Sequence, residues 1–285
     1  MKTKKRLIVL AAIVAVLIAV VVWVAWSNAA IELNTYIIVS SRLPESFNGY
    51  RIAHVSDLHN AQIGTDNEKL LTLLKEANPD MIAITGDLID SRNTNVDIAL
   101  QFVKEAVKIA PCYYVTGNHE ARINAYSELR YGLTSAGVTV LEDASVNVYI
   151  DGEAITLIGV NDPSFETDYL IGDSETVMQS KLSKLLTDGD GFTILLSHRP
   201  ELFDTYVAHD LDLILSGHAH GGQFRIPFVG GVVAPNQGFF PEFDAGIYTE
   251  GNTSMVVSRG VGNSIVPFRV NNRPEIILIE LNSNE

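Results

Sequence analysis

Acidic and histidine side chains recur in this chain directly after short apolar runs. Five runs are followed by polar groups, namely Asp57-Leu58-His59, Gly86-Asp87, Asn118-His119-Glu120, His198 and His218-Ala219-His220. Imidazole nitrogens, carboxylate oxygens and an amide oxygen are donors that suit Mn²⁺, Fe or Zn²⁺. The single cysteine, Cys112, excludes an intramolecular disulfide and a cysteine-based zinc cluster. The chemistry that these residues could do is therefore metal-assisted.

Each of these motifs alone is weak evidence for a metal site. Asp-x-His is frequent by chance, Gly-Asp is usually a turn, and His-x-His is more often structural. What the five share is their position, since each follows a predicted strand. Ligands bind at the carboxyl ends of parallel strands. We therefore expect the five groups, with five of the seven histidines, to gather at one sheet edge.

The elements that must position these groups alternate between strand and helix. Strands are predicted at residues 36–41, 51–56, 81–85, 112–116, 146–150, 154–160, 192–197, 211–216, 255–258 and 275–281. Helices are predicted from a capping box at residues 65–68 up to residue 77, then from 95 to 110, 123 to 136 and 175 to 186. This alternation predicts one α/β domain with largely parallel pairing and no internal linker.

The first thirty residues differ from the rest. Four cations lie within residues 2–6, an uninterrupted apolar run of twenty residues covers 7–26, and no acidic residue precedes Glu32. A helix of that length spans roughly 30 Å, the thickness of a bilayer core. The alternative is a cleaved signal peptide with its site at residues 27–30, although such peptides have shorter apolar regions of about 7–15 residues. We expect a retained transmembrane signal anchor.

The positive-inside rule orients this anchor in the cell membrane. It predicts a single pass with the N-terminus in the cytoplasm and everything after Trp26 outside. The chain then divides into a basic cytoplasmic tail (1–6), the anchor (7–26), a linker with the first strand (27–50) and the folded domain (51–285).

The net charge and the hydrophobic fraction each exclude a class of protein. The whole chain carries −14, and without the cations of residues 2–6 the body has 16 basic against 34 acidic residues, or −18. A nucleic-acid partner bound through a basic surface is therefore excluded. A hydrophobic fraction of 47% with 19% charged residues also excludes a disordered chain.

Taken in order, the five motifs resemble those of the calcineurin-like metallophosphoesterases. The pattern D-x-H, G-D, G-N-H-E, H, G-H-x-H is complete between residues 51 and 223. The segments GHAHGGQ (217–223), SRGVG (258–262) and PEI (274–276) are similar to the bacterial membrane-associated subgroup. The resemblance implies an α/β fold, a four-layer αββα sandwich of two mixed sheets flanked by helices, with a two-metal site at the sheet edge.

The resemblance also implies a role for each matching residue. One divalent ion would be bound by Asp57, His59, Asp87 and His220, and the other by Asp87, Asn118, His198 and His218. A carboxylate has two oxygens, so Asp87 can bridge ions about 3.5–4 Å apart. The ions, Mn²⁺ ahead of Fe or Zn²⁺, would turn a bridging water into the hydroxide that attacks phosphorus. His119, which is outside the ligand set, would act as the general acid.

The implied function is hydrolysis of a phosphoester near a membrane. Phosphoprotein phosphatases of this superfamily carry an arginine where this chain has Ser91, which disfavours that activity. A phosphodiesterase or a hydrolase of a lipid or pyrophosphate fits better. Arg225 and Arg259 are candidate substrate-binding residues, although structural roles are commoner for arginines.

Two other functions remain open. One is a catalytically inactive binding module, which the complete ligand set disfavours. The other is an extracellular nucleotidase or phosphomonoesterase, which the lack of a large second domain disfavours. The sequence does not determine an oligomeric state.

The segment 221–246 is rich in Gly, Pro and Phe and could lie close to the bilayer. The ten residues 27–36 reach at most about 35 Å, which keeps the active site near the lipid headgroups. The phenylalanines of the segment would then form an apolar lip or else pack in the core: Phe224, Phe228, Phe239, Phe240 and Phe243.

Overall fold

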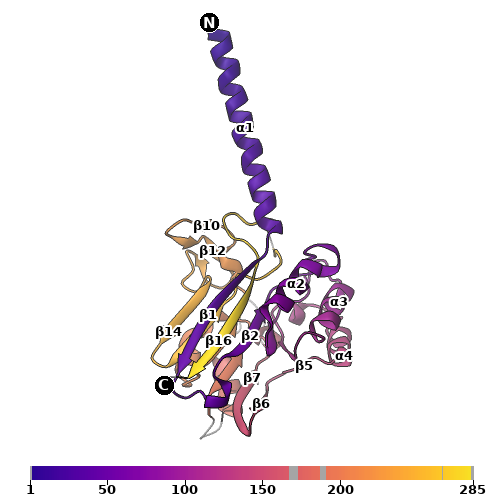
Figure 1. Ribbon diagram of the computed structural model, residues 1–285, viewed down its shortest axis with the longest axis vertical. Helices are drawn as coiled ribbons and strands as arrows, with labels where there is room; N and C mark the ends of the chain where they lie inside the picture. Colours follow the sequence, from indigo (N-terminus) through magenta and orange to yellow (C-terminus); the bar gives the residue numbers. More distant parts are fainter. Residues whose placement is uncertain (1, 167–172, 187–190, 265, 284–285) are drawn as a thin grey trace.

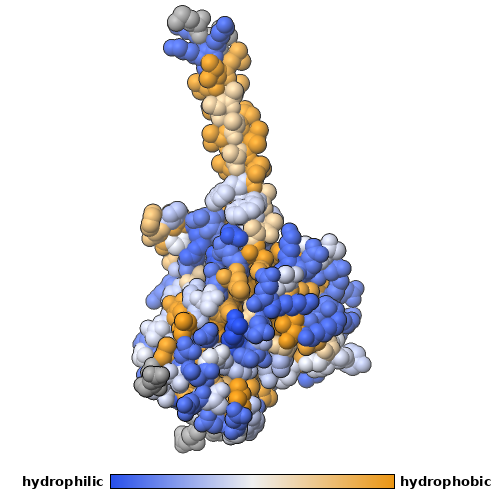
Figure 2. Space-filling view, in the orientation of Figure 1, coloured by the Kyte–Doolittle hydropathy of each residue, from blue (hydrophilic) through white to orange (hydrophobic). Residues whose placement is uncertain are grey.

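One long helix rises from a body built on two β-sheets (Figure 1). The computed structural model describes residues 2–166, 173–186, 191–264 and 266–283. The long helix, α1 (Lys2–Ala29), is long and apolar enough to cross a membrane, and none of its most apolar stretch is buried against the body. Its apolar surface is visible in Figure 2.

The foot of α1 is attached to the body rather than tethered by a loose segment. The Asn28 side chain accepts a hydrogen bond from the Arg269 backbone N–H at 2.7 Å and donates one to the Arg269 carbonyl at 2.9 Å. The Arg273 guanidinium lies 5.0 Å from the Trp26 ring centroid. Only Ala30 and Ile31 separate α1 from the first strand, so the helix leaves the body in a defined direction.

The first sheet contains six strands and carries three of the five motifs. Its order is β1 (Glu32–Ser40), β16 (Glu275–Ser283), β2 (Tyr50–Val55), β3 (Met81–Thr85), β4 (Cys112–Val115) and β5 (Thr139–Val140). All pairs are parallel except β16 with β2. Strands β2, β3 and β4 therefore end together.

The second sheet also contains six strands and carries the other two motifs. Its order is β14 (Gly246–Glu250), β15 (Thr253–Val257), β9 (Leu213–Ser216), β8 (Thr193–Leu196), β7 (Glu153–Gly159) and β6 (Ala144–Ile150). The inner pairs are parallel and the two outer pairs antiparallel. The predicted strands 146–150 and 154–160 form a hairpin, in which a turn at Asp151 and Gly152 joins β6 to β7.

Helices cover the outer face of each sheet, and the sheets pack on each other. One apolar core lies between the first sheet and α2 (Glu68–Ala77), α3 (Val96–Ala106) and α4 (Tyr126–Ala136). A second lies between the sheets, and a third between the second sheet and α5 (Ser174–Leu185) and α6 (Phe203–Val207). Helix α3 begins as its sequence predicts, with the Asn95 side chain accepting from the Asp97 N–H at 3.1 Å. The expected αββα architecture is confirmed.

A glycine-rich excursion leaves the second sheet after β9. It contains the short strands β10 (Arg225–Ile226), β11 (Gly230–Gly231), β12 (Val233–Ala234) and β13 (Gly238–Phe239), paired as two small ladders. We call residues 224–243 the arm. In Figure 1 the arm lies at the end of the body from which α1 rises.

Two expectations about local structure are wrong. The five motifs do not share one sheet edge: β2, β3 and β4 belong to the first sheet, whereas β8 and β9 pair in the second. Residues 65–68 do not form a capping box, because residues 65–67 form a 3₁₀ turn and α2 begins only at Glu68. Asn67, the residue before α2, adopts a left-handed conformation and caps nothing with its side chain.

Candidate metal centre

The loops after five strands bring seven candidate ligands together at one end of the sandwich. All seven are nearly buried: Asp57, His59, Asp87, Asn118, His198, His218 and His220. The backbone at Asp57, His59, Asp87, His218 and His220 has positive φ, between 45° and 65°. Non-glycine residues rarely adopt this conformation, and it concentrates at functional sites. The chain therefore turns sharply at the points where these donors face inward.

The first cluster contains Asp57, His59 and His220, whose donor atoms lie within 4.8 Å of one another. The His220 Nε2 atom is 3.3 Å from Asp57 Oδ1, and the His59 Nε2 atom is 3.1 Å from His220 Nε2. Two ring nitrogens and a carboxylate oxygen thus face a common point.

The second cluster contains Asp87, His198 and His218. The His198 Nε2 atom lies 3.2 Å from Asp87 Oδ2 and 3.2 Å from His218 Nδ1. The same Asp87 oxygen is 3.5 Å from the His59 Nε2 atom of the first cluster. Asp87 therefore stands between the two clusters.

These donors fit a pair of divalent cations. The Asn118 Oδ1 atom is buried and accepts no hydrogen bond from any described residue. An orphaned buried acceptor is costly, and Asn118 lines the same cleft as Asp87, His218 and His220. Hard and borderline donors of this kind are those that Mn²⁺, Fe and Zn²⁺ take.

The electrostatics of the two clusters leave the carboxylates ionised. Burial alone would raise the pKa of Asp87, but His198, His119 and His59 together hold that pKa well below its usual range. Burial lowers the pKa of His220 to about 3, which leaves a neutral imidazole. Burial opposes a proton on His198 too, yet Asp87 and Asp57 raise its pKa to about 10. A cation held by His198 would compete with that proton, because a metal ligand must be a neutral imidazole.

His119 lies beside both clusters with a defined tautomer. Its Nδ1 atom accepts a hydrogen bond from the Ser91 backbone N–H at 2.9 Å, so the proton of the neutral ring is on Nε2. Asp90 Oδ1 is 3.6 Å from the same Nδ1 atom, and the His119 ring packs edge-on against His59 with centroids 4.5 Å apart. Burial lowers the pKa of His119 to about 4.

A cleft of about 150 Å³ opens next to these residues. It is lined by Asp87, Ser91, Arg92, Asn118, His119, Arg122, His218, His220, Pro235 and Ser264. The candidate substrate-binding arginines lie elsewhere: Arg225 pairs with Asp244 at 3.0 Å, and Arg259 pairs with Glu32 and Glu275 at 2.6 Å each. Their role in substrate binding stays a prediction.

Glu120 joins the loops that carry the ligands. Its carboxylate accepts from the backbone N–H groups of Asp87, at 2.9 Å, and Gly117, at 2.7 Å. Burial raises the pKa of Glu120 to about 7, and the neighbouring Asp87 adds to the rise. Glu120 therefore holds the loop after β3 against the loop after β4.

Two residues that the sequence did not point to orient His218. The Asn236 Oδ1 atom is 3.0 Å from His218 Nε2 and accepts from Arg199 Nη1 at 2.9 Å. The Arg199 Nη1 atom lies 3.2 Å from the same His218 Nε2 atom, and together the two groups hold the ring with its Nδ1 atom 3.2 Å from His198 Nε2. Arg199 itself is buried and bound by both oxygens of Asp162. The available signal was the position of Arg199 next to His198.

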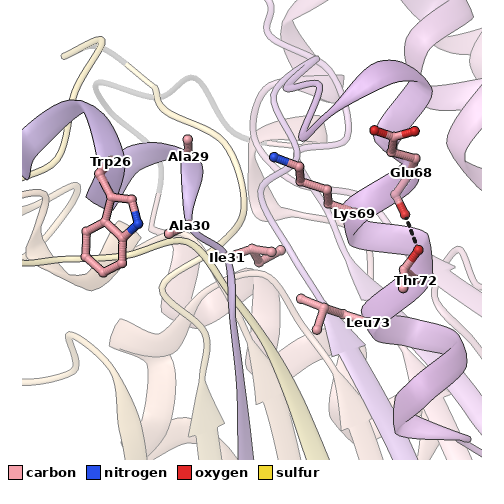
Figure 3. Close-up of a pocket in the computed structure, with 8 residues that line it drawn as sticks. All are labelled: Trp26, Ala29, Ala30, Ile31, Glu68, Lys69, Thr72 and Leu73. Atoms are coloured by element: carbon pink, nitrogen blue, oxygen red, sulfur yellow. Dashed lines mark hydrogen bonds between the residues drawn. The ribbon is translucent and has the colours of Figure 1, made fainter. Parts of the chain in front are cut away.

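A hollow larger than this cleft lies elsewhere, at the foot of α1 (Figure 3). It measures about 570 Å³, with Trp26 and residues 29–31 on one wall and Glu68, Lys69, Thr72 and Leu73 of α2 on the other. None of the candidate ligands lines it, so its size does not make it the reaction site.

Comparison with known proteins agrees with the motifs and the geometry. A family model described as calcineurin-like phosphoesterase matches residues 50–222. The uncharacterized metallophosphoesterase YkuE of Bacillus subtilis is 31% identical over 262 residues, which cover 89% of this chain and 86% of YkuE. Phosphodiesterase YaeI of Escherichia coli is 27% identical over 239 residues, which cover 81% of this chain and 82% of YaeI.

Comparison with a solved structure supports the fold alone. The sulfate thiohydrolase SoxB of Thermus thermophilus superposes with a TM-score of 0.51 at 14% identity, covering 84% of this chain and 57% of SoxB. The resemblance drawn from the five motifs is confirmed by the family match and by the similarity to YkuE. This chain belongs to the calcineurin-like phosphoesterase family and is a metal-dependent phosphoesterase.

Proposed function

We propose that this protein hydrolyses a phosphodiester or pyrophosphate bond of a substrate at a membrane surface, using two divalent transition metals. The observation that carries the proposal is the pair of clusters that share one Asp87 oxygen, 3.5 Å from His59 and 3.2 Å from His198. The name of the relative YaeI, a phosphodiesterase, supports the same class of reaction.

The ligand assignment follows the two clusters. Asp57, His59, Asp87 and His220 would hold one ion, and Asp87, Asn118, His198 and His218 the other. Bound there, two divalent ions supply a Lewis acid, offset the charge of the phosphate and lower the pKa of a water between them. The donor set favours Mn²⁺, with Fe and Zn²⁺ as alternatives.

His119 would be the general acid. As an imidazolium, with its Nδ1–H facing Asp90 Oδ1, His119 could pass its Nε2 proton to the leaving oxygen of a substrate in the cleft and become a neutral ring. Asp90, on the opposite side of the ring, stabilises positive charge that develops there.

The choice of a diester rests on Ser91. At this position the chain has no guanidinium to grip a terminal phosphate, and the Ser91 amide is already used by His119. A phosphomonoesterase or nucleotidase is the second candidate, because Arg92 and Arg122 line the cleft and could bind a dianion.

The membrane arrangement belongs to the same proposal. We place residues 1–6 in the cytoplasm, residues 7–26 in the bilayer as a retained anchor, and the catalytic domain (51–285, with 27–50 leading to it) outside. The body alone carries −18, so bound cations would also remove a repulsion of phosphoesters.

The test is a hydrolysis panel with the full chain in nanodiscs and added Mn²⁺. We expect turnover of bis-p-nitrophenyl phosphate to exceed that of p-nitrophenyl phosphate, and about two metal ions per chain by elemental analysis. Asp87→Ala should abolish activity and most metal, whereas exposed Asp210→Ala should change neither. A wild-type chain that binds no metal, or prefers the monoester, would refute the proposal.

A further inference from the structure

The most exposed phenylalanines of the described residues gather on one part of the surface. Phe228 is fully exposed, Phe239 is 77% exposed and Phe240 is 62% exposed, all on the arm, with half-exposed Phe268 beside it. The five phenylalanines singled out in the sequence divide between the two expected roles. Phe224 packs against Phe268, and Phe243 packs against the rings of Phe203 and Tyr248. The remaining three of the five point outward.

No packing contact among the described residues explains why phenylalanine occupies these positions. Phe228 and Phe240 adopt positive φ of 68° and 55°, a conformation that glycine or asparagine takes at lower cost. Residues 226–241, sixteen in a row, include no Asp, Glu, Lys or Arg. A large apolar patch that is both exposed and conformationally costly marks a contact surface.

The patch is joined directly to the foot of α1. Phe224 and Arg225 pair with Val270 through a bridge and a 3.0 Å hydrogen bond. The adjacent Arg269 is held on both backbone groups by Asn28, in the last turn of α1. Figures 1 and 2 show the arm, with apolar side chains at its tip, beside the point where the apolar helix leaves the body.

The arm also leads toward the metal centre. A mostly apolar hollow of about 300 Å³ lies under it, lined by Val233, Ala234 and Val266 and sharing His220, Pro235 and Ser264 with the cleft. Phe239 pairs with Val233 across the β12–β13 ladder. The patch, the hollow and the cleft are therefore consecutive parts of one surface.

We propose that the arm is a second membrane contact: Phe228, Phe239 and Phe240 insert into the interfacial layer of the bilayer that α1 crosses. Aromatic side chains favour this layer. The patch is uncharged and apolar, and the anchored helix beside it keeps it next to the lipid. The contact turns the mouth of the apolar hollow toward the lipid, so that an amphiphilic phosphoester can reach the cleft without leaving the membrane. This last step rests on the proposed function, but the membrane contact does not.

The contact is tested with the full chain in phosphatidylcholine–phosphatidylglycerol vesicles. Single cysteines at position 228 or 239 carry a nitrobenzoxadiazole label, and Cys112 is buried and does not compete for it. Matched labels sit at Tyr131 and Tyr149, which are as exposed as Phe239 but lie on α4 and β6, away from the arm. We expect a blue-shifted emission at 228 and 239, quenched by lipids with nitroxide in the upper acyl chain, and neither effect at 131 or 149.

Each other outcome overturns the membrane contact. Quenching at 228 no greater than at 149 would mean that the arm stays in water. A blue-shifted emission that persists when detergent replaces the vesicles, together with disulfide-linked dimers through position 228, would mean that the patch binds a second copy of the chain. A label at Val16 in α1 reports separately whether the anchor itself is in the bilayer.

A kinetic comparison tests the route to the cleft. The triple variant Phe228→Asn, Phe239→Ser, Phe240→Asn changes only exposed side chains and suits the positive φ at 228 and 240. We expect about a tenfold or greater loss on a vesicle-borne phosphodiester lipid, and an unchanged rate on bis-p-nitrophenyl phosphate. An equal loss on both would overturn the route, and no activity of the wild type on either would refute the proposed function instead.

Discussion

Single protons decide what the imidazoles of the candidate centre can do. His119 and His218 are both oriented by neighbours at one ring nitrogen, so that the other ring nitrogen faces the candidate centre. Ser91 donates to His119 Nδ1 and leaves the Nε2–H of the neutral ring free to donate, whereas Asn236 and Arg199 contact His218 Nε2 and leave Nδ1 facing His198. Neighbouring groups that are not themselves reactive thus orient the two rings differently, His119 toward the cleft and His218 toward His198.

If His119 is the general acid, its loss should lower the rate of hydrolysis without lowering the metal content. His119→Ala should keep the bound metal but lose roughly 10²–10⁴-fold in kcat for alkyl diesters, the usual contribution of a general acid. The loss should shrink for p-nitrophenolate, a leaving group that needs no proton. Elemental analysis with steady-state kinetics measures both, and His209→Ala is the matched surface control. Loss of metal in His119→Ala would make this residue a ligand.

Substitution of Asn236 tests whether a residue that contacts the candidate ligand His218 affects metal binding. Asn236→Gly removes the acceptor and suits the backbone φ of 60° at this position, so the fold should persist. We expect Mn²⁺ affinity to fall by about 10–100-fold, as when other outer partners of metal ligands are removed. Titration calorimetry measures the affinity, and Asn236→Asp, which retains an acceptor, should recover most of it. Equal weakening in both variants would show that the amide only shapes the loop.

At the scale of elements, the centre depends on loops that touch backbone to backbone. The loops after β3 and β4 approach so closely that a Cβ at Gly117 would collide with the Asp87 side chain and lie 2.6 Å from the Asp87 nitrogen. A Cβ at Gly86 would lie 2.5 Å from the Gly117 nitrogen. The Glu120 carboxylate spans the same two loops. The glycines of these motifs are therefore needed for space around Asp87.

Gly117→Ala should expose this requirement. The added methyl group must push the Asp87 loop aside, at a cost of about 1–3 kcal/mol in the free energy of unfolding, as for other overpacked sites. Activity should fall much further, because Asp87 stands between both clusters. Denaturant unfolding and the diester assay measure the two effects. Gly191→Ala is the control, since the nearest atom to its Cβ is 3.9 Å away, and an equally active Gly117→Ala would contradict the argument.

At the scale of the whole molecule, the contacts at the foot of α1 fix the direction of the helix relative to the body. Ser27 is buried and Asn28 is bonded to Arg269, so the body cannot swing on a ten-residue tether. With α1 in the bilayer as proposed, the opening of the cleft would therefore keep one orientation to the membrane normal.

The orientation across the membrane is tested by protease access. With four cations before the apolar span and none in residues 27–41, protease added to intact cells or protoplasts should digest the catalytic domain while a cytosolic marker survives. Immunoblotting of the two proteins measures the result. Protection of the domain until the membranes are opened would reverse the topology.

The sequence by itself determined the chemistry-bearing residues, their place at strand ends and the apolar length of α1. These depend on residue type and on local periodicity, which nearest neighbours along the chain set. Tertiary structure alone decided that β8 and β9 pair in a second sheet, because hydrogen bonds between distant strands leave no local pattern. It also decided that Asn236 reaches His218 and that Phe239 faces solvent while Phe243 packs inside. Contacts of this kind depend on what folds across from a residue, and the same residue type serves either outcome.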